Sequence, residues 1–176
     1  MASIIKVDTI QTAAGGTPTA ADLGINTTGN LLQVVRNTYA TQTALSTDAY
    51  TDTGLTATIT PKSSTSTILV IAVMQYRLEC TTTGQDVGIG FKILRGSTSI
   101  YTSATTYSNY IYYPGLSSYN FRSNSTYTAE DTSHGSTSEL TYKVQMGGYN
   151  ASSGNTTVDT QNGGNASSLL LIEIAG

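Results

Sequence analysis

One short and strongly apolar stretch gives the clearest structural signal: Ser168-Leu169-Leu170-Leu171-Ile172-Glu173-Ile174-Ala175-Gly176. A run of this length and composition is typical of a strand that is buried on both faces of a sheet. Because successive side chains of a strand alternate, Leu170, Ile172 and Ile174 should share one face and the residues between them the other. One face can fill the core, but little else in the chain can cover the second. We therefore expect an all-β domain that packs against copies of itself.

A second stretch has the same property: Thr67-Ile68-Leu69-Val70-Ile71-Ala72-Val73-Met74. A buried helix is the alternative for a run of this kind. Its β-branched residues and the polar continuation Gln75-Tyr76-Arg77-Leu78-Glu79 favour a long strand.

The rest of residues 31–176 alternates between strand-like segments and turn signals. Gly54 to Thr60 alternates apolar and polar residues, and Pro61 ends it. Val87 to Arg95 contains glycines that indicate close packing or a bulge. Leu140 to Met146 alternates well, and Gly147-Gly148 is expected to end it. We expect roughly eight to ten strands, which predicts a single antiparallel β-sandwich of the jelly-roll type.

Residues 1–30 form a separate segment that is too short to bury a core. Ser3 to Ile10 is expected to be extended, and the cluster Thr12 to Pro18 interrupts it. The segment is either a flexible tail or an N-terminal arm that docks on another protein. The spacing of its apolar residues favours docking, and the candidate docking residues are Ile4, Ile5, Val7 and Ile10.

Composition argues against several classes of function. Charged residues make up only 11% of the chain and the net charge is −3, which opposes binding to nucleic acid. The sequence has no apolar run long enough for a transmembrane helix, and its N-terminus lacks the pattern of a signal peptide. Cys80 is the only cysteine, so we expect a small buried hydrophobe rather than a disulfide.

The residues that usually support catalysis or metal binding are sparse. His134 is the only histidine and lies in the turn-like stretch Asp131-Thr132-Ser133-His134-Gly135. A Ser-His-Asp triad requires a positioned base and orienting group, which neighbours in one turn do not supply. We therefore expect no enzyme activity, no cofactor and no metal, although a lone calcium ion in a loop stays open. A glycan hydrolase would need two carboxylates at a defined separation, and the candidates are Glu79, Glu130, Glu139 and Glu173.

The tyrosine-rich region 103–135 is the main candidate for ligand binding. Tyrosine combines a flat apolar ring with a polar tip, which suits contact with sugars and with protein surfaces. Packing within the domain or between subunits is the structural alternative. The surface-binding candidates are Tyr107, Tyr110, Tyr112, Tyr113 and Tyr119.

Parts of the sequence resemble short fibre and appendage proteins of marine bacteriophage virions. The opening Ala2-Ser3-Ile4-Ile5-Lys6-Val7-Asp8-Thr9-Ile10-Gln11 and the Gly- and Ala-rich turn after it are similar to the start of such proteins. The remainder is similar to short phage fibre domains that end in a strand like Leu169 to Gly176. In those domains a phrase like Tyr50 to Pro61 precedes a turn and a long apolar strand. Residues 103–135 take no part in this resemblance.

The order of strands also resembles the compact jelly roll of the tumour-necrosis-factor and C1q type, whose inner sheets pack about a threefold axis. This resemblance implies a homotrimer in which the two doubly apolar strands lie in the inner sheet. The subunit-interface residues that it implies are Leu69, Ile71, Val73, Leu169 and Leu171.

Together these features favour a structural protein on the exterior of a phage virion. It would be a short homotrimeric fibre of the tail, head or neck that docks on other virion proteins through residues 1–30. Its jelly roll would bind a host-surface glycan or protein. One alternative is a capsid-decorating protein that stabilises the shell. Another is a secreted, C1q-like carbohydrate-binding module, which would normally have a signal peptide and disulfides.

Overall fold

The computed structural model describes residues 9–19, 22–23, 28–112, 114–115 and 117–176. The all-β prediction is confirmed. The strands are β1 (Leu31–Tyr39), β2 (Thr43–Ala44), β3 (Thr51–Ile59), β4 (Thr67–Cys80), β5 (Asp86–Arg95), β6 (Thr98–Thr102), β7 (Asn109–Tyr112), β8 (Tyr119–Asp131), β9 (Leu140–Tyr149), β10 (Thr156–Thr160) and β11 (Ser167–Ile174), with a short 3₁₀ helix, η1, at Asn162–Gly164.

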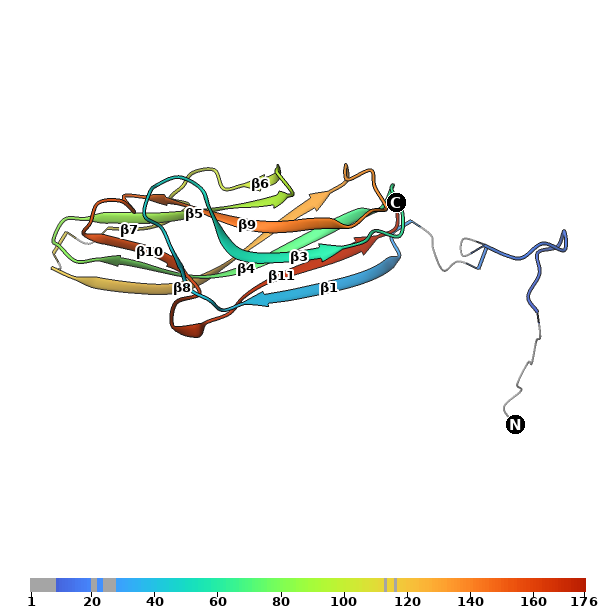
Figure 1. The fold of residues 1–176 in the computed structure, drawn as a ribbon, viewed down its shortest axis with the longest axis horizontal. Coiled ribbons are helices and arrows are strands. Elements are labelled where there is room, and N and C mark those ends of the chain that lie inside the picture. The colour runs from blue at the N-terminus through green and yellow to red at the C-terminus, as the bar shows by residue number, and fades with distance from the viewer. Residues whose placement is uncertain (1–8, 20–21, 24–27, 113, 116) are drawn as a thin grey trace, which may run out of the picture.

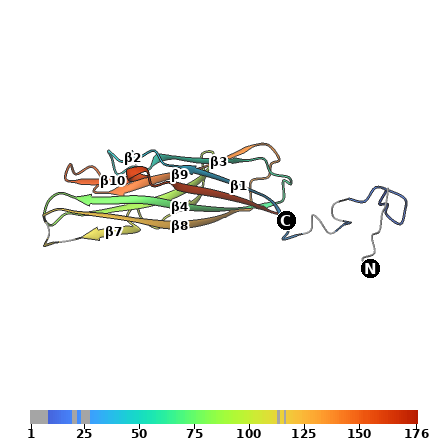
Figure 2. The ribbon, with the colours of Figure 1, turned by 90° about the horizontal axis from the view of Figure 1, so that it is seen from below.

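The strands form two antiparallel sheets that lie face to face (Figures 1 and 2). In sheet A, β4 pairs with β8 on one side and with β11 and β10 on the other, and β1 and β2 pair with β11 and β10. Since β10 and β11 pair with successive parts of β4, they act as two segments of one interrupted strand. Sheet B has the order β3-β9-β5, and β6 and β7 pair with the two ends of β5.

This pairing is that of a jelly roll. When β1 with β2, β6 with β7, and β10 with β11 each count as one interrupted strand, the chain has eight strand positions. The first position then pairs with the eighth, the second with the seventh, the third with the sixth and the fourth with the fifth. Connections of this kind alternate between the sheets and close a sandwich.

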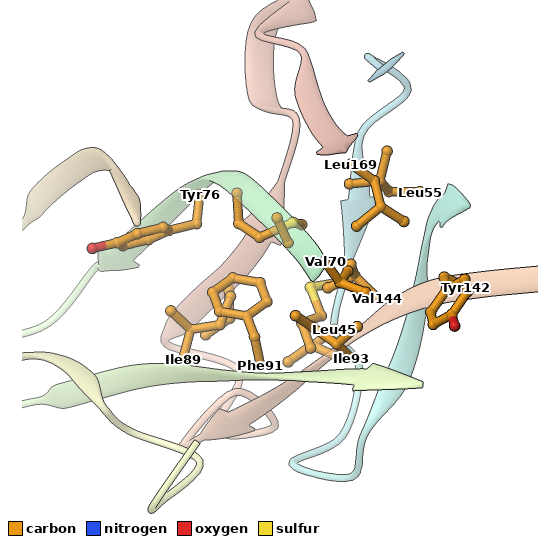
Figure 3. Packing of buried hydrophobic residues seen from close by; sticks show 14 of the residues in the cluster. Leu45, Leu55, Val70, Tyr76, Ile89, Phe91, Ile93, Tyr142, Val144 and Leu169 are labelled. Carbon is orange, nitrogen blue, oxygen red and sulfur yellow. The ribbon is translucent and has the colours of Figure 1, made fainter. Parts of the chain in front are cut away.

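The stretch at 67–74 is the first half of β4, which runs for 14 residues, and the alternative of a buried helix is wrong. Burial alternates strictly along β4: Val70, Ala72 and Met74 are fully buried, and the residues between them are half-buried. The inward side chains of sheet A meet those of sheet B, such as Ile89 and Phe91 of β5, in one core (Figure 3).

The alternation predicted for the last strand is confirmed, but two of the interface residues were assigned to the wrong face. Leu169 and Leu171 of β11 are fully buried in the core, so they cannot meet another subunit. Leu170, Ile172 and Ile174 are half-buried and point away from sheet B. The sequence does not distinguish these faces because both are apolar.

Glycines of sheet B permit a loop to pack closely onto it, as the sequence indicated. Gly88 and Gly90 of β5 face outward, and residues 103–108, between β6 and β7, cross over them. A Cβ at Gly90 would lie 2.3 Å from the carbonyl oxygen of Thr105. Gly147 and Gly148 do not end β9, which continues to Tyr149.

Only part of the N-terminal segment is described. Ile4, Ile5 and Val7 lie outside the described residues, and Ile10 is 54% exposed. Residues 9–19 lie beyond the end of the sandwich at which β1 begins and β11 ends (Figure 1). Hydrogen bonds between Gly29 and Ala175 and between Asn30 and Ala175 prolong the pairing of β1 with β11 towards that segment. The docking function and the domain boundary at residue 30 stay predictions.

Candidate functional site

The single histidine has a structural position. His134 is 8% exposed, and its Nε2–H donates to the backbone oxygen of Ser66 at 2.8 Å, because a carbonyl can only accept. Its Nδ1 lies 3.3 Å from the amide nitrogen and 3.1 Å from the carbonyl oxygen of Ser136. Both ring nitrogens therefore contact backbone atoms, and His134 fixes the loop after β8 to the turn before β4.

The side chains around His134 do not form a catalytic triad. The Ser66 hydroxyl lies 2.7 Å from Glu173 Oε1 and 3.3 Å from His134 Nε2, so the serine, not the histidine, occupies the middle position. In a triad, the histidine must accept a proton from the serine while a carboxylate orients it. Here Nε2 already carries a proton directed at a backbone oxygen, and Ser66 is buried.

Glu173 is a fully buried carboxylate whose hydrogen bonds are supplied by four groups. Gln33 Nε2 donates at 2.5 Å, Ser66 Oγ at 2.7 Å, and the amides of Lys62 and Ser63 at 2.7 and 3.2 Å. Burial alone would raise the pKa of Glu173, but these donors outweigh it and lower the pKa. This carboxylate joins β1, β11 and the turn after β3.

A second buried carboxylate belongs to the sequence around His134. Asp131 is 2% exposed and pairs with Arg95 Nη1 at 2.6 Å, and it accepts from the hydroxyl of Tyr142 at 2.8 Å. Burial, together with this hydrogen bond, raises the pKa of Tyr142. Asp131 therefore connects the two sheets and is not directed at His134. Among the described residues, no group of three or more His, Cys, Asp or Glu is placed to hold a metal ion.

The outer face of sheet A carries a continuous group of apolar side chains, which we call the apolar strip. Cross-strand pairing places Val34, Ile172 and Leu69 in one row, and Leu170 and Ile71 in the next. The members of the apolar strip are Leu31, Val34, Leu69, Ile71, Val73, Leu170, Ile172 and Ile174. Leu31 and Val34 are 61% and 51% exposed, and nothing in the described part of the chain covers the strip.

The surroundings of the apolar strip are polar. Arg36 of β1 and Glu130 of β8 are exposed at its two edges, and neither has an ion-pair partner among the described residues. A shallow depression of 310 Å³ lies beside Leu69 and is also lined by Thr128, Ala129 and Glu130. Towards the other end of sheet A, Arg77 pairs with Asp159 at 2.6 Å and with Glu79 at 3.0 Å.

The outer face of sheet B carries three tyrosines in mutual contact, which we call the tyrosine cluster: Tyr107, Tyr110 and Tyr149. Their ring centroids lie 4.9 Å apart for Tyr107 and Tyr149, and 6.1 Å apart for the other two pairs. Tyr107 and Tyr110 are 45% and 46% exposed. Large exposed apolar surface of this kind indicates an interaction site more often than isolated side chains do.

Polar groups border the tyrosine cluster on one side. The Tyr110 hydroxyl donates to Asp86 Oδ2 at 2.8 Å, and Asn150 Nδ2 donates to Asp86 Oδ1 at 2.5 Å. The hydrogen bond to Asp86 raises the pKa of Tyr110 to about 12. Of the other tyrosine candidates, the two that the structure describes, Tyr112 and Tyr119, do not join these ring contacts. Tyr112 is exposed, Tyr113 lies outside the described residues, and Tyr119 packs on the core with the Cys80 thiol 3.5 Å from its hydroxyl.

Sequence reasoning missed Tyr149 because it follows Gly147-Gly148, which was expected to end the strand. The outward parity of residues 141, 143 and 145 would have placed it on the solvent face had the strand been extended. Asp86 and Asn150 were missed because polar residues in turns are common and their convergence depends on the fold.

The fold and these surfaces define a jelly-roll β-sandwich with one apolar and one aromatic outer face. No protein-family model matches the sequence, and no curated protein sequence matches it. Among solved structures, the chain is similar to the VP2 subviral particle of infectious bursal disease virus, with 14% identity and a TM-score of 0.42. The match covers 82% of this chain and 33% of that chain. The structure of the Gx strain of the same virus matches with 14% identity and a TM-score of 0.26, over 81% of this chain and 32% of that chain. The chain therefore spans about a third of the matched structures.

Proposed function

We propose that this chain is a non-enzymatic structural protein of a bacteriophage virion, a short homotrimeric fibre on the outside of the particle. Residues 1–30 dock on other virion proteins, and the jelly roll presents a surface to the host. The observation that supports self-association is the apolar strip on sheet A. The resemblance of the opening and closing phrases to phage fibre proteins supports the virion assignment.

The apolar strip is more stable when a second copy of this chain covers it than when it faces water. A face of a sheet that is apolar across three strands is costly to leave in water, at about 25 cal/mol per Å² of apolar surface. The edges of the strip carry opposite charges, Arg36 on β1 and Glu130 on β8. When one copy follows the next around an axis, the β1 edge of one meets the β8 edge of its neighbour. The depression beside Leu69 offers space for an apolar side chain of that neighbour.

Light scattering of the purified full chain tests the trimer directly. We expect a mass of three chains for the wild type and of one chain for the double variant Leu69→Asp and Ile172→Asp. Asn124→Asp is the matched control, because Asn124 is exposed on the same face of sheet A but pairs with Gln75, beyond the end of the strip. A wild-type monomer, or a double variant that stays trimeric, contradicts the proposal.

The virion assignment requires a test on particles. Antibodies against the β-sandwich should label the outside of purified phage particles in electron micrographs, and the same particles should contain the chain by mass spectrometry. Proteases should cleave residues 1–30 in the free protein and spare them in the particle. Cleavage at the same rate in both states would rule out docking through this segment.

A further inference from the structure

We propose that the tyrosine cluster and the Asp86 carboxylate beside it form a binding site for a neutral glycan. This inference rests on the proposed role of the jelly roll as a host-binding surface and names the ligand class and the residues that contact it. It concerns sheet B, so it does not depend on the contacts of the apolar strip.

The tyrosine cluster is held in a fixed position by its supports. Tyr107 belongs to the loop between β6 and β7, and this loop rests directly on the glycines of β5. A Cβ at Gly88 would lie 2.4 Å from Cβ of Tyr107, so only glycine allows the loop this close to the sheet. Tyr110 and Tyr149 belong to β7 and β9, which pair with β5 on either side of Gly88. Rings on paired strands lose little freedom on binding, and this pre-organisation favours affinity.

The chemistry of the site matches a sugar. The apolar face of a pyranose ring, with its C–H groups, packs on an aromatic ring, and sugar hydroxyls require hydrogen-bond partners at the edge of that ring. Next to Tyr110, the carboxylate of Asp86 and the side-chain carbonyl of Asn150 supply hydrogen-bond acceptors. Each oxygen of Asp86 accepts one hydrogen bond within the chain and keeps a second lone pair for a ligand hydroxyl.

Charge distinguishes a neutral glycan from an acidic one. Among the described residues, Asp86 is the charged side chain that hydrogen-bonds to the tyrosine cluster. The nearest cation on the same strand is Lys92, and its Nζ already lies 3.8 Å from the ring centroid of Tyr50. A carboxylate without a cation beside it repels sialic acids, uronic acids and sulfated sugars.

Geometry excludes an aromatic cage for a quaternary ammonium. Such a cage needs rings that stand apart and surround the cation, with each ring face about 6 Å or less from it. In the tyrosine cluster the rings contact one another, with centroids 4.9–6.1 Å apart, so no space remains between them. A ligand can only lie against the outer, solvent-exposed sides of these rings.

A printed array of neutral and acidic oligosaccharides, probed with the full chain, identifies the ligand. Titration calorimetry with a single-site neutral oligosaccharide from the array then measures affinity without avidity. We expect Tyr107→Ala to bind about tenfold more weakly or worse, Tyr107→Phe to keep most of the affinity, and Asp86→Asn to weaken it. Phe121→Ala is the matched control, because Phe121 is an exposed aromatic residue of sheet A and is 42% exposed.

Light scattering and thermal melting of the same samples separate loss of binding from loss of structure. Tyr107→Phe retains the ring, so it reports on the site even if Tyr107→Ala loosens the loop. The inference is overturned if no neutral glycan binds, if acidic glycans or choline bind better, or if Tyr107→Ala binds as wild type. A wild-type trimer that binds no glycan overturns this inference and leaves the trimeric-fibre proposal standing.

Discussion

At Glu173, burial and charge oppose each other. Its carboxylate is fully buried, and four donors from β1 and from the turn between β3 and β4 hold it ionised. The resulting pKa is lower in the folded chain than in the unfolded chain, where it is about 4.3. The stability that Glu173 provides is therefore complete above that unfolded pKa and is lost as the pH falls through the folded pKa.

We expect the urea midpoint of the wild type to fall when the pH is lowered from about 5 to 3. Glu173→Gln should be less stable at pH 7 by about 1–3 kcal/mol, because its NH2 group replaces one acceptor oxygen and then faces either the Lys62 amide or the Gln33 amide, both of which are donors. Its stability should also depend less on pH over the acidic range. Asp52→Asn is the control, since Asp52 has a lowered pKa but is 53% exposed. Equal acid sensitivity of wild type and Glu173→Gln would show that other carboxylates determine it.

Gly90 tests the close approach of the loop to sheet B. In Gly90→Ala the added Cβ would lie 2.3 Å from the oxygen of Thr105 and 3.0 Å from Cα of Thr106, which are backbone atoms and cannot rotate away. We expect a loss of about 1–3 kcal/mol in unfolding free energy, measured by urea denaturation. Gly115→Ala is the control, because nothing lies within 4 Å of its Cβ position. If Gly90→Ala has the same unfolding free energy as the wild type, the loop does not rest on β5.

For single residues, the sequence predicted the kind of structural role better than it predicted which side chains meet in the fold. The glycines of β5 were interpreted as marks of close packing or of a bulge, and at Gly88 and Gly90 the structure shows close packing. The buried partners of Glu173 and Asp131 were not predictable. They come from segments up to 140 residues apart, and no local pattern records that convergence.

At the scale of the strand, β11 presents one row of side chains to the core and the other row to the outside of sheet A. Its odd-numbered residues face the core and its even-numbered leucine and isoleucines face outward. The alternation of side chains along β11 followed from the two-residue period of a strand, but the sequence did not show which of the two faces of β11 meets the core. Glu173 shares the core face, contrary to the usual rule that a glutamate marks the solvent side. Its four hydrogen bonds explain the exception.

Neighbouring residues of β11 should therefore give opposite results when shortened. Leu171→Ala removes a fully buried side chain and should cost about 2–5 kcal/mol of unfolding free energy. Ile172→Ala should cost less in the monomer and should instead weaken self-association, seen as dissociation at higher protein concentration. Chemical denaturation and sedimentation velocity measure the two effects separately. If Ile172→Ala destabilises the monomer as much as Leu171→Ala does, Ile172 is buried within the monomer and does not lie on an exposed face.

At the scale of the whole molecule, the two sheets have different outer faces. Sheet A presents aliphatic side chains bordered by opposite charges, and sheet B presents tyrosines bordered by hydrogen-bonding groups. Aliphatic surface favours permanent burial, whereas tyrosine tolerates both water and a ligand. A self-associating sheet A would leave sheet B facing outward, where a glycan can reach it.

Arg36 and Glu130 provide the sharpest test of how copies of the chain meet. They lie on opposite edges of sheet A, about 16 Å apart across three strand spacings and a two-residue offset, so they are too distant to pair within one chain. In a ring in which each β1 edge meets the next β8 edge, they pair between chains. Arg36→Glu and Glu130→Arg should each weaken the trimer through like-charge contacts, by about tenfold in dissociation constant at low salt. The double variant should restore it, because the charges are exchanged but still complementary.

Arg122→Glu, on the same face but at the distant end of β8, should leave the trimer unchanged. Light scattering also distinguishes three chains from two, since a face-to-face dimer would form the same pair. Failure of the double variant to recover would place these two edges apart in the assembly.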